Sequence, residues 1–167
     1  MKQVAFLIMM LFVTKTYSAK LEIEELKTLF EAAAYSKASA DRFLKLLSTV
    51  DHSSTPILIC YKGVAEMMQA KYGFNPISKL RRFKKGKTLI EEAVKKQPDN
   101  LEIRFLRLAI QTNLPAFLNY SDNIIEDEKY LLANIQTIKN KNLKQDILKY
   151  LLASKHCSAE EKKELAI

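Results

Sequence analysis

Residues 101–111 read LEIRFLRLAIQ and place two arginines in an otherwise apolar run. On a helical wheel, Arg104, Arg107 and Gln111 share one narrow polar stripe. Two apolar arcs flank this stripe, one made of Leu101, Phe105, Leu108 and Ala109 and the other of Ile103, Leu106 and Ile110. A guanidinium group presents its donors as a planar fork that suits a carboxylate or a phosphate. The stripe is therefore the first candidate site for an acidic group of a partner.

The two arginines also have a structural interpretation. A helix this apolar must be flanked by other helices, so its polar stripe emerges along a seam between them. In that seam the arginine stems lie on apolar surface, and the guanidinium groups pair with carboxylates of adjacent helices. The candidate carboxylates are Glu91, Glu92, Glu126 and Asp127. We expect this structural role, with partner binding as the alternative.

A basic run at residues 79–87, KLRRFKKGK, forms the second candidate site. Positive charge in the first turns of a helix opposes the helix macrodipole, so local helix stability does not explain the placement. Clustered cations bind polyanions by releasing counterions. The run predicts an acidic partner or an anionic membrane surface, and the alternative is a solvated face around Leu80 and Phe83. Its candidate binding residues are Lys79, Arg81, Arg82, Lys84 and Lys85.

The connection at residues 113–120, NLPAFLNY, is apolar and aromatic where loops are normally polar. We expect Phe117 and Tyr120 to pack on the ends of the neighbouring helices. The alternative is a recognition lip, and Tyr120 is counted among the candidate partner-binding residues for that reason.

Catalytic and metal-binding patterns are weak in this sequence. The letters of a hydrolase triad occur in DHSS, residues 51–54, but consecutive residues cannot easily provide the required geometry. Glu66 is the acid in the most apolar helix, and Lys62 lies four residues before it, so an exposed ion pair is expected there. An exported hydrolase that uses Glu66 is the alternative. We expect no catalytic residue, no metal and no cofactor.

The two cysteines, Cys60 and Cys157, allow one disulfide. With His52 and His156 they show none of the paired spacings of a zinc site. Apolar neighbours on both sides of Cys60 favour a buried thiol. Two free thiols are expected, and a Cys60–Cys157 bridge is the alternative.

The elements that must position these residues are helices. Apolar residues recur at spacings of three and four, and no long alternation argues for a strand. The pattern predicts an all-α fold of about seven helices in antiparallel hairpins, at residues 21–34, 39–50, 56–72, 76–96, 100–112, 122–138 and 142–153.

Helix ends are marked by capping residues. Thr55 before Pro56, and Asn75 before Pro76, are expected N-caps. Gly73 is expected to adopt the left-handed C-terminal cap. The spacing of Ser158 and Glu161 predicts a capping box in a short last helical turn.

Residues 86–100, GKTLIEEAVKKQPDN, resemble the second half of a tetratricopeptide repeat, with matching residues at Gly86, Ile90, Ala93, Pro98 and Asn100. The resemblance implies closely packed helical hairpins in a short right-handed array. Gly63 is the corresponding small residue of the first half, but it lies 35 positions before Pro98, so this fit requires a longer third helix.

Residues 75–127 are similar to an uncharacterised exported all-helical family from Bacteroidota, bacteria related to Bacteroides and Flavobacterium. This similarity covers about a third of the chain. It implies an exported array of helical hairpins and assigns no catalytic residue.

The first 18 residues have the anatomy of a secretory signal peptide: Lys2, an apolar run at residues 4–13, and then small and polar residues. The apolar run is too short to cross a hydrocarbon core of about 30 Å. Cleavage before Ala19 predicts a periplasmic or secreted protein with one domain, residues 19–167.

Charge and location together define the expected function. Cleavage removes two lysines and leaves 25 basic against 19 acidic residues. The sequence predicts an exported binding or scaffold module that contacts a protein or peptide through a groove between helix pairs. Attachment to an anionic membrane is the alternative. Nucleic acid is not an expected partner, because no aromatic platform accompanies the basic run.

Overall fold

The computed structural model describes residues 18–165, which form eight α-helices, two 3-10 helices and no strand. The predicted all-α fold is therefore confirmed. The predicted signal peptide lies outside the described residues, except for Ser18, which begins the first helix. The elements are α1 (Ser18–Ala33), α2 (Lys37–Leu46), α3 (Pro56–Tyr72), α4 (Pro76–Lys96), α5 (Leu101–Thr112), η1 (Ala116–Leu118), α6 (Ile124–Asn134), η2 (Ile135–Thr137), α7 (Lys141–Ala153) and α8 (Ala159–Leu165).

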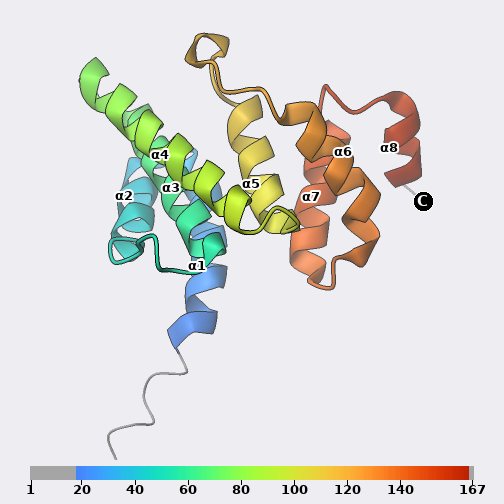
Figure 1. Ribbon diagram of the computed structural model, residues 1–167, viewed down its shortest axis with the longest axis horizontal. Helices are drawn as coiled ribbons and strands as arrows, with labels where there is room; N and C mark the ends of the chain where they lie inside the picture. The colour runs from blue at the N-terminus through green and yellow to red at the C-terminus, as the bar shows by residue number, and fades with distance from the viewer. Residues whose placement is uncertain (1–17, 166–167) are drawn as a thin grey trace, which may run out of the picture.

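Consecutive helices pack as pairs, namely α1 with α2, α3 with α4, and α5 with α6. The pairs stack side by side, because α3 contacts both α1 and α5. Figure 1 shows the resulting row of helices along the longest axis of the molecule, with α7 and α8 at the C-terminal end. The expected arrangement in helical hairpins is confirmed.

Helix α5 is shared by two hydrophobic cores. Ile103, Leu106 and Ile110 belong to the core that α1 to α4 build. Phe105 and Leu108 belong to a second core with α6 and α7. The first set is one apolar arc of the helical wheel and the second set is part of the other arc, so the two arcs face different cores.

Helices α3 and α4 approach each other at two glycines, Gly63 and Gly86. A Cβ atom on Gly63 would lie 2.8 Å from the Gly86 carbonyl oxygen, and one on Gly86 would lie 2.6 Å from the Gly63 carbonyl oxygen. The backbones meet because neither residue has a side chain. Helix α3 has 17 residues and α4 has 21, and this length brings Gly63 opposite Gly86.

Several predicted helix ends are confirmed. The Asn75 side chain accepts hydrogen bonds from the amides of Ile77 (2.8 Å) and Ser78 (3.3 Å) at the start of α4. At α8 the capping box closes in both directions, because the Ser158 amide donates to Glu161 (2.7 Å) and the Glu161 amide donates to the Ser158 hydroxyl (3.2 Å).

One prediction about caps is wrong, and another is confirmed in position only. Gly73 has extended angles (φ −72°, ψ 146°) and not left-handed ones, because the chain must reach the cap of α4 two residues later. Thr55 occupies the N-cap position of α3, but its side chain makes no capping hydrogen bond.

Two helices are shorter than predicted. Helix α2 ends at Leu46, and Lys62 of α3 donates to the carbonyl oxygens of Ser48 and Val50, which holds residues 47–50 in turns. Helix α6 ends at Asn134 and continues as η2. At this point the Asn134 side chain donates to the Tyr130 carbonyl oxygen (2.8 Å), and the Thr137 hydroxyl donates to the Asn134 carbonyl oxygen (2.7 Å). Such side-chain hydrogen bonds compete with the backbone hydrogen bonds of a helix.

Candidate functional site

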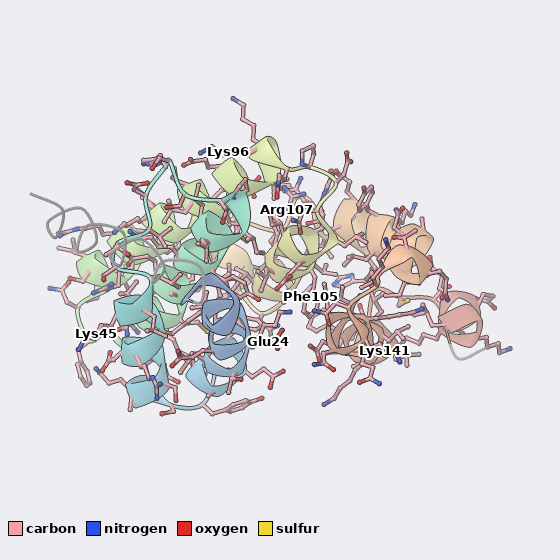
Figure 2. All side chains as sticks on the ribbon, turned by 90° about the horizontal axis from the view of Figure 1, so that it is seen from below. Glu24, Lys45, Lys96, Phe105, Arg107 and Lys141 are labelled. Carbon is pink, nitrogen blue, oxygen red and sulfur yellow. The ribbon has the colours of Figure 1, made fainter. Side chains whose placement is uncertain are left out.

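Asp127 of α6 closes the seam in which the two arginines of α5 lie. Its carboxylate is 0% exposed and accepts from Arg107 Nε and Nη2 and from Arg104 Nη1, each at 2.7 Å. Arg107 Nη1 also donates to Glu91 of α4 at 3.0 Å. Figure 2 shows Arg107 in the middle of the molecule, between the two ends of the helical row. The bidentate pair joins α5 to α6, and the contact to Glu91 adds α4.

Arg104 is also surrounded by partners. Its Nε donates to the Pro98 carbonyl oxygen at 2.7 Å, its Nη1 donates to Glu126 at 2.6 Å, and its guanidinium lies 4.9 Å from the centre of the Tyr130 ring. Burial lowers the pKa of an arginine, but the hydrogen bonds from Arg104 to Glu126 and Asp127 outweigh this effect and raise its pKa. Both arginines therefore stay charged in the seam.

Gln111 and Tyr120 are buried as well. The Gln111 Nε2 atom donates to Asn123 at 3.3 Å, and its Oε1 atom is buried without a hydrogen-bond partner among the described residues. The Tyr120 hydroxyl donates to Glu91 at 2.6 Å, and Lys87 lies 4.8 Å from the centre of its ring. The expected packing of Tyr120 is confirmed, whereas that of Phe117 is wrong, because Phe117 is 83% exposed.

The polar stripe on α5 thus forms a seam in which both arginines are taken up by ion pairs within the protein. Three of the four candidate carboxylates pair there, and Glu92 instead contacts Lys96 (2.7 Å) and His52 (2.5 Å). Asp127 lies opposite both arginines, so their guanidinium groups donate to carboxylates of the protein itself. This geometry supports the structural interpretation of Arg104 and Arg107, and the basic run remains the candidate partner site.

The basic run divides into three groups. Arg82 and Lys85 point toward α3, where they pair with Glu66 at 2.8 Å and 2.6 Å. Lys87 lies over the Tyr120 ring. The remaining cations, Lys79, Arg81 and Lys84, are exposed, and no carboxylate of residues 24–163 pairs with them. Of the two apolar residues expected to anchor the run, Phe83 is buried but Leu80 is exposed.

The expected exposed pair of Glu66 with Lys62 is wrong. Glu66 is only 4% exposed, because α4 covers the polar strip of α3 on which it lies. Its two carboxylate oxygens accept from Arg82 and Lys85 of α4. Lys62 instead donates to the carbonyl oxygens that follow α2. A spacing of four residues identified a possible pair, and the covering helix provided nearer partners.

A hollow of about 390 Å³ opens where α2, α3 and α4 meet. A second hollow of about 240 Å³ shares Glu66, Arg82 and Lys85 with the first and adds Ser78 and Arg81. We call the two together the cationic groove, because five cations line it against two acids, Asp41 and Glu66. Its cations are Lys45, Lys62, Arg81, Arg82 and Lys85.

The acids of the groove are occupied. The Gln69 amide donates to Asp41 at 2.7 Å, and Lys37 pairs with the same carboxylate at 2.7 Å. These two hydrogen bonds lower the pKa of Asp41. Glu66 holds Arg82 and Lys85 side by side, while both cationic side chains remain partly exposed to solvent. The groove therefore keeps an excess of positive charge that its own acids do not balance.

The remaining candidates show structural roles. In DHSS, the Asp51 carboxylate accepts from the Ser53 amide (2.8 Å) and hydroxyl (2.6 Å), which forms a turn between α2 and α3. Among residues 18–165, no three His, Cys, Asp or Glu side chains converge on a point suited to a metal ion. Over the same residues, no helix has the length and apolarity needed to cross a bilayer.

Cys60 and Cys157 are free thiols, and both are buried. Burial raises the pKa of each thiol, which keeps it protonated and slow to react. We expect Ellman's reagent to modify the native protein slowly and to detect both thiols of each chain in denaturant without reductant. A disulfide would be revealed by thiols that remain undetected until a reductant is added.

Comparisons of the chain with protein-family models, curated proteins and solved structures found no match.

Proposed function

We propose that the protein is a helical binding module whose cationic groove receives an acidic segment of a protein or peptide partner. The observation that carries this proposal is the pair formed by Arg82 and Lys85. Buried Glu66 holds both side chains at the floor of an open hollow, and each keeps donors available to solvent. The proposed site thus lies between helices α2, α3 and α4, and not at the arginine seam.

The physical basis of recognition is charge complementarity. An incoming carboxylate can accept from the free guanidinium donors of Arg82 and from Lys85, and charge-assisted hydrogen bonds are stronger than neutral ones. Lys45 and Arg81 extend the positive surface to either side. Leu44 adds an apolar contact to the wall. These features favour a short peptide with two or more acidic residues, and the excess positive charge speeds its association.

The proposal includes export of the protein to the periplasm or the medium, on the basis of the first 18 residues. N-terminal sequencing of the protein from the secreting cell tests this part separately. A mature chain that begins near Ala19 is the expected result, and a chain that still begins at Met1 contradicts it.

Binding of a fluorescently labelled hexaglutamate peptide tests the groove. We expect the triple substitution E66Q/R82Q/K85Q to weaken binding by about tenfold or more, because it removes two charge-assisted contacts. Glu66 is replaced together with its partners so that no buried carboxylate is left unpaired. Fluorescence anisotropy at low salt measures the affinity, and circular dichroism checks the fold of the variant.

A variant that neutralises the same number of cations elsewhere is the control. Lys139→Gln with Lys141→Gln neutralises two exposed lysines before and at the start of α7, at the opposite end of the molecule from Lys45 (Figure 2). This control is expected to bind nearly as well as the unmodified protein. Equal weakening by both variants, or no binding by the unmodified protein, contradicts a groove-specific site.

A hydrolase that uses Glu66 is the second candidate, favoured by the position of this buried acid at the floor of the hollow. An acid catalyst needs an oxygen that is free to hold a proton toward the substrate. In this groove both Glu66 oxygens already accept from cations. We therefore expect no Glu66-dependent hydrolysis of chromogenic glycosides, and a rate that is lost in E66Q would instead favour the enzyme.

A further inference from the structure

A cluster of exposed apolar side chains lies where α3 turns into α4. Phe74 is 99% exposed, Ile77 is 71% exposed, and Leu80 is also exposed. We call these three residues the apolar tip. Figure 1 shows that the N-terminal end of α4 projects beyond the neighbouring helices at one end of the molecule. The apolar tip therefore lies where it can contact another surface without obstruction by the neighbouring helices.

The tip is built on rigid structure. The Asn75 cap and Pro76 start α4 directly after Phe74. Ile77, Leu80 and Lys84 follow at spacings of three and four residues and share the outer face of α4, and the opposite face carries buried Phe83 and Gly86. The core therefore holds α4 in the orientation that directs Ile77 and Leu80 outward.

Cations surround the tip. Residues 71–88 contain seven lysines and arginines and no acidic residue. Lys79, Arg81 and Lys84 are exposed and have no carboxylate partner among residues 24–163. We call these three residues the tip cations. A second exposed aromatic residue, Tyr35, lies nearby, because Tyr72 and Lys71 at the end of α3 donate to the carbonyl oxygens of Ala33 and Ala34 (2.8 Å and 2.5 Å).

We propose that the apolar tip inserts into the headgroup region of an anionic lipid bilayer while the tip cations contact the lipid phosphates. An apolar face flanked by lysine and arginine is the pattern of interfacial membrane binding. A stable protein interface buries about 800 Å² on each partner, more than three side chains supply. A few inserted side chains joined to several cations are enough for reversible attachment to a bilayer.

The apolar tip is distinct from the cationic groove, although Arg81 borders both. The groove uses Arg82 and Lys85, which pair with Glu66 of α3, whereas Phe74, Ile77 and Leu80 do not line it. Attachment at the tip would place the groove close to the membrane. The two proposals can fail independently, because F74A/I77A leaves every groove residue in place and E66Q/R82Q/K85Q leaves every tip residue in place.

Sedimentation with lipid vesicles tests the proposal. We expect the chain that begins at Ala19 to bind vesicles with about 30% phosphatidylglycerol and to bind phosphatidylcholine vesicles weakly. Phe74→Ala with Ile77→Ala should lower the partition coefficient by about tenfold or more, since each side chain loses its apolar burial. Substitution of the three tip cations by glutamine should lower it by on the order of 100-fold at low salt. About 0.5 M salt should reduce binding of the unmodified protein, because the attraction is then screened.

Matched variants separate the tip from general surface properties. Phe117→Ala removes another exposed phenylalanine, in η1, and K139Q/K141Q/K149Q removes three exposed lysines near and in α7. Both are expected to bind vesicles as the unmodified protein does. The proposal is overturned if the unmodified protein stays in the supernatant, or if F74A/I77A binds unchanged. It is also overturned if F74A/I77A alters only self-association in sedimentation velocity, which would mean that the tip contacts a second copy.

Discussion

Replacement of Asp127 by asparagine is expected to lower the free energy of unfolding by about 3 to 5 kcal/mol. The carboxylate is fully buried and accepts three hydrogen bonds from Arg104 and Arg107. An amide keeps the shape of the side chain but removes its charge and presents one donor group to the arginines. Two guanidinium groups then remain in the seam with too little negative charge. Loss of one partner from a buried ion cluster costs far more than loss of a surface pair.

Chemical denaturation monitored by circular dichroism measures this effect. Glu126→Gln is the control, because Glu126 also accepts from Arg104 Nη1, at 2.6 Å, but its side chain is 60% exposed. An exposed pair contributes at most about 1 kcal/mol. The prediction is contradicted if the two variants lose the same free energy of unfolding, or if D127N unfolds as the unmodified protein does. Either result would mean that the buried ion pairs of Asp127 contribute little to stability.

Gly86→Ala is expected to destabilise the protein by about 2 to 3 kcal/mol, even though alanine is the better helix former by about 1 kcal/mol. The new methyl group would lie 2.5 Å from Met67 Cγ and 2.6 Å from the Gly63 carbonyl oxygen. Met67 can change its rotamer. The carbonyl oxygen belongs to the backbone of α3, so the two helices must separate and the core between them must repack.

Gly73→Ala is the control for the glycine prediction. A Cβ atom at Gly73 has its nearest neighbour at 3.4 Å, on the flexible side chain of Lys79, and the backbone angles suit any residue. Its stability is expected to change by less than about 1 kcal/mol. The thermal unfolding midpoints of both variants measure the effect. Equal midpoints for G86A and G73A would mean that the close approach of α3 and α4 does not require glycine at position 86.

The arginine seam and the glycine contact have related consequences for function. The glycine contact brings α3 against α4, and these two helices carry Glu66, Arg82 and Lys85 of the groove. The seam then links α5 to α6 and, through Glu91, to α4. Both contacts hold α4 in place, and α4 bears Arg81, Arg82 and Lys85 of the groove and Ile77 and Leu80 of the apolar tip. A change in either contact is therefore expected to affect both proposed surfaces.

Much of the fold was predictable from the sequence, because it depends on residues that are close in the chain. The spacing of apolar residues predicts the helices, and the two arcs of α5 match its two cores. Asn75 and Ser158 cap helices as their local patterns predict. Each of these features requires only a few neighbouring residues to adopt helical angles.

The partners of the charged residues were decided by the tertiary structure. Asp127 was one of four carboxylates expected as possible partners of Arg104 and Arg107. Because α6 packs on α5, Asp127 pairs with both arginines. Glu66 pairs with Arg82 and Lys85 of the next helix, and not with Lys62 four residues away. Tertiary packing also divides the basic run. Arg82 and Lys85 pair with Glu66, Lys87 lies over the Tyr120 ring, and the other cations of the run remain exposed. A helical period specifies which residues share a face, but the energy of a charge depends on what covers that face, and the covering helix comes from a distant part of the chain.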